Sequence, residues 1–196
     1  MSTYLKPAAM LLMILTLITG VIYPGVVTVL AQLMFADQAN GSLIVDEQGH
    51  AKGSALIGQP FTATRYFWGR PSATGPQPYN AEASAGSNLG PTNPALIHAV
   101  SARIKALQAA YPTNNAPVPV DLVTASASGL DPHISIAAAE YQINRIAKAR
   151  QIDAVKLREL VDEFTESRQW QVFGEPRVHV LRLNVALDEL KRKSGQ

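Results

Sequence analysis

Small polar residues gather in one short stretch, and they are of the types that hold anions. Thr124 to Ser135 reads TASASGLDPHIS, with Ser126, Ser128, Gly129 and Asp131 between a predicted strand and a predicted helix. Backbone amides at a helix start can bind an anion, and a glycine lets a phosphate approach closely. The phosphate-binding patterns G-x-x-x-x-G-K-[ST] and G-x-G-x-x-G are both absent from the sequence. Two interpretations therefore stay open, an anion or nucleotide site and, more simply, a well-capped turn.

Two catalytic chemistries are conceivable and poorly supported. A hydrolase could combine Ser126, His133 and Asp131, but no G-x-S-x-G elbow is present, and triads are defined by geometry rather than by sequence order. The sequence also gives little support for a metal centre. Its four histidines are scattered and show no H-E-x-x-H or similar ligand spacing: His50, His98, His133 and His179. The absence of cysteine excludes a thiol nucleophile, a disulfide framework and Cys-ligated zinc or iron. The sequence thus predicts no catalytic residue and no metal ligand.

Short helices and strands must position these residues. The patterns predict a strand at 120–123, a helix that begins at Ser135 or at Asp131-Pro132, a helix over 153–166, a strand at 177–183 and a last helix capped by Asn184. The expected inward residues of the two middle helices are Ile136, Ala139, Ile143, Ile146, Leu157, Leu160, Val161 and Phe164. An earlier helix, with Asn93 as N-cap and Pro94 as its first residue, ends at Pro112 and buries Leu96, Ile97, Val100, Ile104, Leu107 and Tyr111.

Two irregular regions precede these elements. Residues 42–61 contain apolar pieces at 43–45 and 55–57 around Gly49, which suggests a β-hairpin with a longer loop. Residues 66–94 are rich in proline and glycine and show no periodicity, yet their aromatic residues argue against disorder. We expect an ordered loop that docks against something, its own domain being the simplest choice. Arg70, beside the aromatic triplet, should stack on a ring or bind a carboxylate.

The most informative stretch for location runs from Pro7 to Ala36, where Tyr23 is the only ionisable residue. About twenty apolar residues cross a bilayer, so this segment, with a core at about 11–33, predicts one transmembrane helix. A cleaved signal peptide would be shorter and end in a small-residue site, and a core helix apolar on every face is hard to cover. Gly20, Pro24 and Gly25, together with scattered threonines, suggest a helical partner within the membrane.

Charge and length bound the remainder. Lys6 lies before the span and Asp37 after it, so the positive-inside tendency predicts a cytoplasmic head at 1–6 and an exported domain at 37–196. That domain mixes strands and helices, so the expected fold class is a single transmembrane helix plus a small α/β (α+β) extracytoplasmic domain. The formal net charge of +2 does not argue for nucleic acid as a partner.

Six segments in one order resemble a known family: GSALIGQPF (53–61), YFWGRPSA (66–73), YNAEASAGSNLGPTNP (79–94), VPVDLVTASASGLDPHIS (118–135), RIAKAR (145–150) and GEPRVHVLRLNVALD (174–188). They resemble the C subunit of the Kdp potassium-transporting P-type ATPase. Ala85, Ile136 and His179 depart from the family's usual glycine, proline and asparagine, which puts local geometry in doubt rather than membership.

The resemblance implies an accessory subunit of a high-affinity, ATP-driven potassium importer in the bacterial inner membrane. Its implied partners are a channel-like potassium-binding subunit, the P-type ATPase subunit, a small single-helix subunit and membrane lipid. It implies no firmly bound cofactor, but a proposed role as a catalytic chaperone that raises the ATP affinity of the ATPase subunit. Ser126, Ser128, Gly129, Asp131 and Gln142 match the region proposed to touch nucleotide.

Topology opposes direct contact with ATP, because an exported domain cannot reach the cytoplasm across about 30 Å of hydrocarbon. We therefore expect the domain to cap the entrance of the channel-like subunit while the span holds the subunits together. The alternative is an independent membrane-anchored periplasmic binding protein or enzyme.

Overall fold

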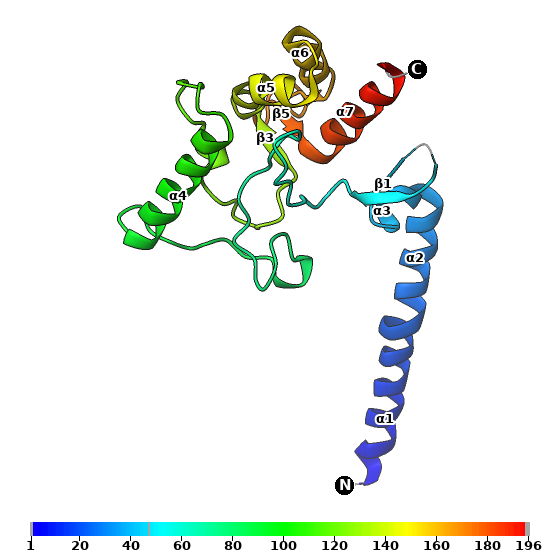
Figure 1. The fold of residues 1–196 in the computed structure, drawn as a ribbon. Coiled ribbons are helices and arrows are strands. Elements are labelled where there is room, and N and C mark those ends of the chain that lie inside the picture. The colour runs from blue at the N-terminus through cyan, green and yellow to red at the C-terminus, as the bar shows by residue number, and fades with distance from the viewer. Residues whose placement is uncertain (1, 47, 195–196) are drawn as a thin grey trace. The chain divides into compact units, whose positions relative to one another are not determined.

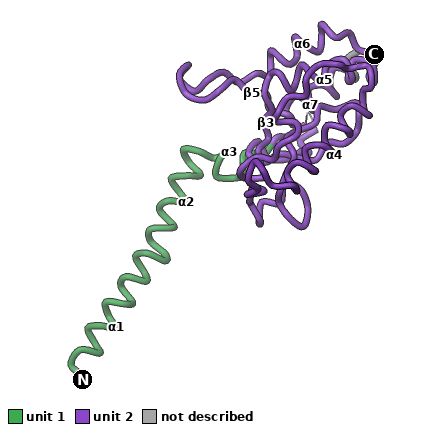
Figure 2. The backbone as a smooth tube through the Cα atoms, turned by 90° about the vertical axis from the view of Figure 1, so that its left-hand side faces the viewer, with its two compact units in different colours: residues 1–43 green, residues 44–196 purple. Residues whose placement is uncertain are grey.

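The computed structural model describes residues 2–46 and 48–194, which form two compact units (Figure 2). Unit 1 comprises residues 1–43 and unit 2 residues 44–196.

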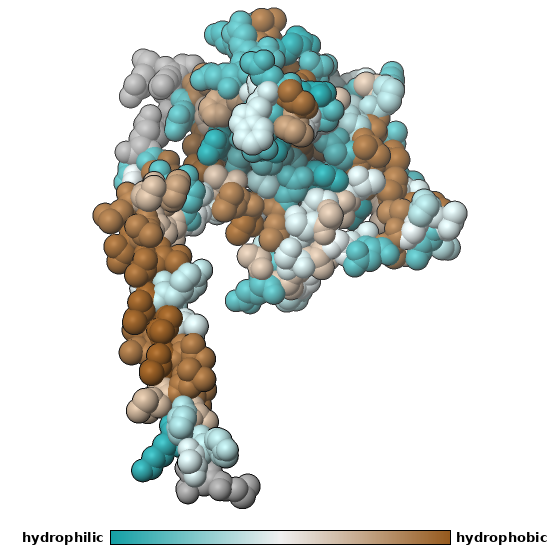
Figure 3. Space-filling view, turned by 180° about the vertical axis from the view of Figure 1, so that it is seen from behind, coloured by the Kyte–Doolittle hydropathy of each residue, from teal (hydrophilic) through white to brown (hydrophobic). Residues whose placement is uncertain are grey.

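Unit 1 is dominated by one long apolar helical run. It contains α1 (Ser2–Leu17), one π-helical turn η1 (Ile18–Ile22), α2 (Tyr23–Met34) and the short α3 (Ala36–Ala39). Pro24 lacks an N–H group and its ring crowds the preceding turn, so the wide π turn just before it accommodates the proline without breaking the helix. Residues 3–34 are long and apolar enough to cross a membrane, and none of the most apolar window is buried (Figure 3).

A two-stranded sheet pairs β1 (Leu43–Val45), which spans the boundary between the units, with β2 (Ala51–Ser54). The expected hairpin is therefore present, but its second arm precedes the apolar piece at 55–57 that was assigned to it. The side chain of Asp46 explains the difference, because it accepts the N–H groups of Gln48 and His50 and pairs with Lys52 at 2.9 Å. These contacts tighten the turn and bring Lys52 into the second strand.

A three-stranded antiparallel sheet with the order β3-β5-β4 lies at the centre of unit 2. Its strands are β3 (His133–Ser135), β4 (Thr165–Glu166) and β5 (Arg177–His179). Helices α5 (Ile136–Arg150) and α7 (Val180–Ser194) pack against it, and α6 (Ala154–Glu163) packs against these two helices (Figure 1). Antiparallel strands with separate helices make unit 2 an α+β domain.

Two helices begin at predicted caps, Asn93 and Ser135, and a third begins after Asp153, where only the start of a helix was predicted. The side chains of Asn93, Ser135 and Asp153 accept N–H groups in the first turns of α4 (Pro94–Ala110), α5 and α6. Ser135 is thus the start of α5, rather than Asp131-Pro132. The apolar faces predicted for α5 and α6 are buried or partly buried. The face predicted for α4 is less so, since Leu107 is buried while Ile97 is 54% exposed.

Four sequence predictions are wrong in the second half of the domain. The helix predicted over 153–166 ends earlier, because α6 stops at Glu163 and Thr165–Glu166 form β4. Val120–Leu122 forms a 3-10 turn, η3, rather than a strand, because the Val120 carbonyl accepts two N–H groups and the Thr124 hydroxyl. The last strand stops at His179, and α7 begins directly at Val180. Asn184 lies inside that helix, 2% exposed, and does not cap it. Asn184 is instead bonded to Phe67, 117 positions away in the sequence, whereas the hydrogen bonds that form η3 are local.

The loop at 66–94 is ordered and irregular, apart from the 3-10 turn η2 (Ala81–Ala83), as expected. It packs against its own domain: Phe67 is completely buried in the core. Arg70 donates to the Asp131 carboxylate at 3.2 Å, which confirms the second of its two predicted contacts. The loop therefore connects the core to the turn at 124–132.

Candidate functional site

Several polar groups of the turn at 124–132 form hydrogen bonds with one another. The Ser126 hydroxyl, which is buried, accepts the Gly129 N–H at 2.9 Å, and the Ser128 hydroxyl accepts the Leu130 N–H at 3.1 Å. Gly129 has a φ of +68°, a left-handed conformation that glycine adopts without strain. Both hydroxyl oxygens therefore stabilise the turn as acceptors, and each hydroxyl keeps its O–H group as a donor.

The irregular loop covers this turn. The Ser72 hydroxyl donates to the Gly129 carbonyl at 2.7 Å, and the Ser84 hydroxyl donates to the Ser128 carbonyl at 3.0 Å. Gly129 must remain glycine here, because a Cβ atom would lie 2.7 Å from the Ala85 carbonyl oxygen. The turn and the loop are thus packed directly against each other.

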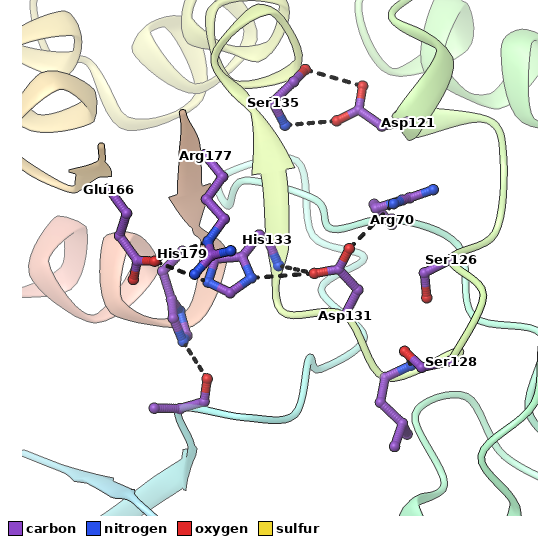
Figure 4. Close-up of polar contacts among 12 residues, drawn as sticks. Arg70, Asp121, Ser126, Ser128, Asp131, His133, Ser135, Glu166, Arg177 and His179 are labelled. Atoms are coloured by element: carbon purple, nitrogen blue, oxygen red, sulfur yellow. Dashed lines mark hydrogen bonds and ion pairs between the residues drawn. The ribbon is translucent and has the colours of Figure 1, made fainter. Parts of the chain in front are cut away.

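Charged side chains continue from this turn across the sheet (Figure 4). Asp131 contacts Arg70 and the Nδ1 atom of His133, each at 3.2 Å. The Nε2 atom of the same imidazole lies 3.4 Å from Glu166, which accepts from Arg177 Nε at 3.0 Å. Each ring nitrogen of His133 thus faces a carboxylate. We call these five residues the charged row.

The charged row keeps its two carboxylates ionised. Burial alone would raise the pKa of Asp131, but hydrogen bonds from His133 and the nearby charges of His133 and Arg70 lower it below its ordinary value. Burial also opposes ionisation of Glu166, and the hydrogen bond from Arg177 and the charges around it lower that pKa as well. Carboxylates held as anions are poorly suited to donate protons, so the row resembles a structural ion network more than a catalytic one.

His179 packs edge-on against His133, with ring centroids 5.1 Å apart, because the two residues are direct cross-strand partners. Its Nε2 atom lies 2.9 Å from the Ala55 carbonyl, and its Nδ1 atom accepts the Arg182 N–H at 3.4 Å. This pattern fits a neutral ring that carries its proton on Nε2. Burial also lowers the pKa of His179 below its ordinary value, which favours the neutral ring.

Two open depressions border the charged row. One, of about 510 Å³, is lined by Ser126, Ser128, Asp131 and Arg70. The other, of about 550 Å³, lies beside β3 and is lined by Arg70, Asp131, His133 and the segment 175–177, among others. Three of the residues predicted to meet nucleotide, Ser126, Ser128 and Asp131, thus share one surface depression. Gly129 lies beside them and is packed against the loop.

Gln142 lies elsewhere. It is 1% exposed, and its amide accepts the Trp68 N–H at 2.8 Å and donates to the Trp68 carbonyl at 3.1 Å. Its Oε1 atom also accepts from Arg145, whose guanidinium stacks 4.4 Å from the centroid of the Trp68 ring. Desolvation lowers the pKa of Arg145 to about 10. The amide of Gln142 is therefore fully engaged inside the core.

The arrangement offers no assembled active site among the predicted residues. The hydroxyl of Ser126 accepts from Gly129, and both ring nitrogens of His133 face carboxylates, so neither residue is oriented toward the other as a triad requires. Within 2–46 and 48–194, no group of three or more histidine, aspartate and glutamate side chains has the geometry to hold a metal ion.

Glu166 and Arg177 were missed by the sequence analysis. The alternation of Arg177, Val178 and His179 indicated that the two polar side chains share one face of a strand. Nothing in the sequence pattern indicated that Glu166 and His133 would lie against that face.

Comparison with known proteins is consistent over almost the whole chain. The profile of the family described as "KdpC: K+-transporting ATPase, c chain" matches residues 5–189. The "Potassium-transporting ATPase KdpC subunit" of Herpetosiphon aurantiacus is 59% identical, over 97% of this chain and 98% of its own length. The proteins of the same name from Methylococcus capsulatus and Polaromonas naphthalenivorans are 60% and 61% identical over 97% of this chain, covering 100% and 97% of their own lengths.

Proposed function

This chain belongs to the KdpC family of K+-transporting ATPase c chains, and on that premise we propose that it is a non-catalytic accessory subunit of an ATP-driven potassium-import complex. Its role would be to assemble and stabilise the complex. The proposed partners are the channel-like potassium-binding subunit, the P-type ATPase subunit and the small single-helix subunit. The absence of an assembled active site among the predicted residues supports an accessory role.

The observation that carries this proposal is the apolar helix of residues 3–34, none of whose most apolar window is buried within the chain. A helix apolar on all sides needs lipid or other membrane helices around it. We place it across the bacterial inner membrane, with residues 1–6 in the cytoplasm and the folded domain in the periplasm, where the domain would cap the entrance of the channel-like subunit.

The proposed effect on ATP affinity would then be indirect. Ser126 and Ser128 accept hydrogen bonds within their own turn, and Gln142 is buried against Trp68. The burial of Ser126 and Gln142 supports a role in which the domain biases the conformation of the assembly, as opposed to one in which these side chains touch nucleotide. The nucleotide region around 126–131 stays a prediction.

Labelling of single cysteines tests the topology, because the chain has no native cysteine. We choose Ser128→Cys in the exposed turn, since Ser126 is buried, and Thr3→Cys at the other end as the matched control. In intact spheroplasts a membrane-impermeant maleimide should label the first variant and not the second, and lysis should expose both. Labelling of Thr3→Cys alone before lysis would reverse the proposed orientation.

Purification in mild detergent tests the assembly. A tag on this chain should recover large polytopic subunits in fixed proportion, together with potassium-dependent ATP hydrolysis. Recovery of an isolated monomer that binds a small ligand would instead support the independent periplasmic protein.

A further inference from the structure

A short hairpin between β4 and β5 carries the most exposed aromatic side chain of unit 2. Gln169 and Phe173 form an antiparallel bridge in which each N–H donates to the other residue's carbonyl at 2.9 Å. Trp170 and Gln171 turn the chain between them with φ values of 50° and 64°. In Figure 2 a loop beside the β5 label projects from the remainder of unit 2.

The tip of this hairpin is apolar and exposed. Trp170 is 83% exposed, Val172 68% and Phe173 60%, and the two aromatic rings meet edge to face with centroids 6.0 Å apart. Other aromatic residues of the same unit are placed differently, since Phe67 is fully buried and Trp68 packs against the core. We call Trp170, Val172 and Phe173 the aromatic tip.

Charges at the base of the hairpin are already paired. Arg168 contacts Glu175 at 2.5 Å, and Arg177 contacts Glu166 at 3.0 Å. An apolar centre with a polar rim is the usual anatomy of a protein interface. Because the rim charges are already paired, they need no new partner when another protein covers the apolar centre. The balanced charge also gives the tip little attraction for anionic lipid headgroups.

The aromatic tip is also pre-organised. Its two rings are held by a short bridged turn, so seating them on a partner orders few additional bonds. Tryptophan is the residue most enriched among the side chains that dominate interface energies. Two copies of such a small tip, placed against each other, would fall well short of the roughly 800 Å² per partner that stable interfaces bury.

The base of the hairpin borders the depression of about 550 Å³ beside β3. Glu175, Pro176 and Arg177 line that depression and also lead out of the hairpin, so the two surfaces are continuous. We propose that this continuous surface docks on another subunit of the potassium-transporting ATPase complex, with the aromatic tip inserted into an apolar pocket of that subunit. The inference rests on the proposed function, because the partner exists only if the chain acts within the assembly.

Photocrosslinking in the whole assembly tests the docking. With p-benzoylphenylalanine in place of Trp170, irradiation should give an adduct with another protein subunit. An adduct with the ATP-hydrolysing subunit would support the docking while overturning the proposed position over the channel entrance, so the two proposals can fail separately. Adducts formed only with lipid or with a second copy of this chain would overturn the docking.

Titration of the full-length chain into detergent-solubilised complex lacking it measures the strength of the contact. Trp170→Ala with Phe173→Ala should weaken association by about 30-fold, the scale of an interface hot spot. The matched control is Val155→Ala, a 54% exposed residue on α6, which should bind as the unaltered chain does. Circular dichroism and the urea midpoint establish that each variant is folded. Equal affinity of the folded double variant and the control would overturn the inference.

Discussion

Asn184 holds the main chain of Phe67 with two hydrogen bonds, accepting its N–H and donating to its carbonyl, each at 2.9 Å. The two residues are 117 positions apart in the sequence. Gln142 makes the same pair of contacts with Trp68. Two buried amides thus take the place of a neighbouring strand for a loop that has none, which explains how an irregular segment can pass through the core with its polar groups satisfied.

Asn184→Ala should destabilise the chain by about 2 to 4 kcal/mol, because it leaves the Phe67 N–H and carbonyl buried without partners. The measurement is urea unfolding of the full-length chain in detergent, followed by tryptophan fluorescence. Asn144→Ala, an exposed asparagine on α5, is the matched control and should be close to neutral. If both substitutions cost the same, the two hydrogen bonds contribute nothing measurable.

Gln142→Ala should also destabilise the chain by about 2 to 4 kcal/mol, for the same reason. In the assembled complex, at a temperature where the variant is folded, the KM for ATP should stay within about twofold of the unaltered complex. A large rise in KM with unchanged stability would favour direct contact between this region and nucleotide.

Gly129→Ala should cost about 3 kcal/mol. The substitution adds a side chain in a left-handed conformation and places its Cβ 2.7 Å from the Ala85 carbonyl oxygen, so both backbone strain and overpacking oppose it. Gly90→Ala is the control, because no heavy atom lies within 4 Å of its added Cβ. Thermal unfolding of both variants measures the difference, and equal melting temperatures would contradict the close packing of turn and loop.

The folded domain should lose stability on acidification in two stages. The pKa of His179 is lowered in the folded state. As the pH falls below about 6.5, the ordinary pKa of histidine, this side chain takes up a proton in the unfolded chain before it does so in the folded chain, and the unfolded state is favoured. Asp131 and Glu166 also have lowered pKa values when folded. Their contribution is present above the ordinary values of 3.8 and 4.5 and is lost as pH falls through the folded values.

His179→Asn isolates the first stage. The variant should show a flatter dependence of unfolding free energy on pH between 7 and 5, by at most about 1.4 kcal/mol per pH unit. The change below 4.5 should be smaller, because His179 is only the last of the causes that lower the pKa of Glu166. Urea titrations at a series of pH values give both slopes. Parallel curves for the two chains across the whole range would show that His179 does not titrate differently on folding.

The sequence by itself determined the features that depend on neighbouring residues. An uninterrupted apolar run is sufficient to predict a membrane-spanning helix. Caps such as Asn93 and Ser135 act on amides within the next few residues, so they could be predicted from spacing. The buried faces of α5 and α6 followed from helical periodicity in the same way. The order of distinctive segments was sufficient to indicate the family.

The tertiary structure alone decided where the polar residues act. The separation between Asn184 and Phe67, or between Glu166 and His133, carries no periodic signal, so neither pairing could be read from the sequence. Ser126 and Gln142, which the family resemblance joined in one site, lie in different surroundings, because the Ser126 hydroxyl accepts a hydrogen bond within its own turn and Gln142 is buried against Trp68. Local patterns specify a helix or a turn, but the partner of a buried polar group is chosen by packing between segments that are distant along the chain.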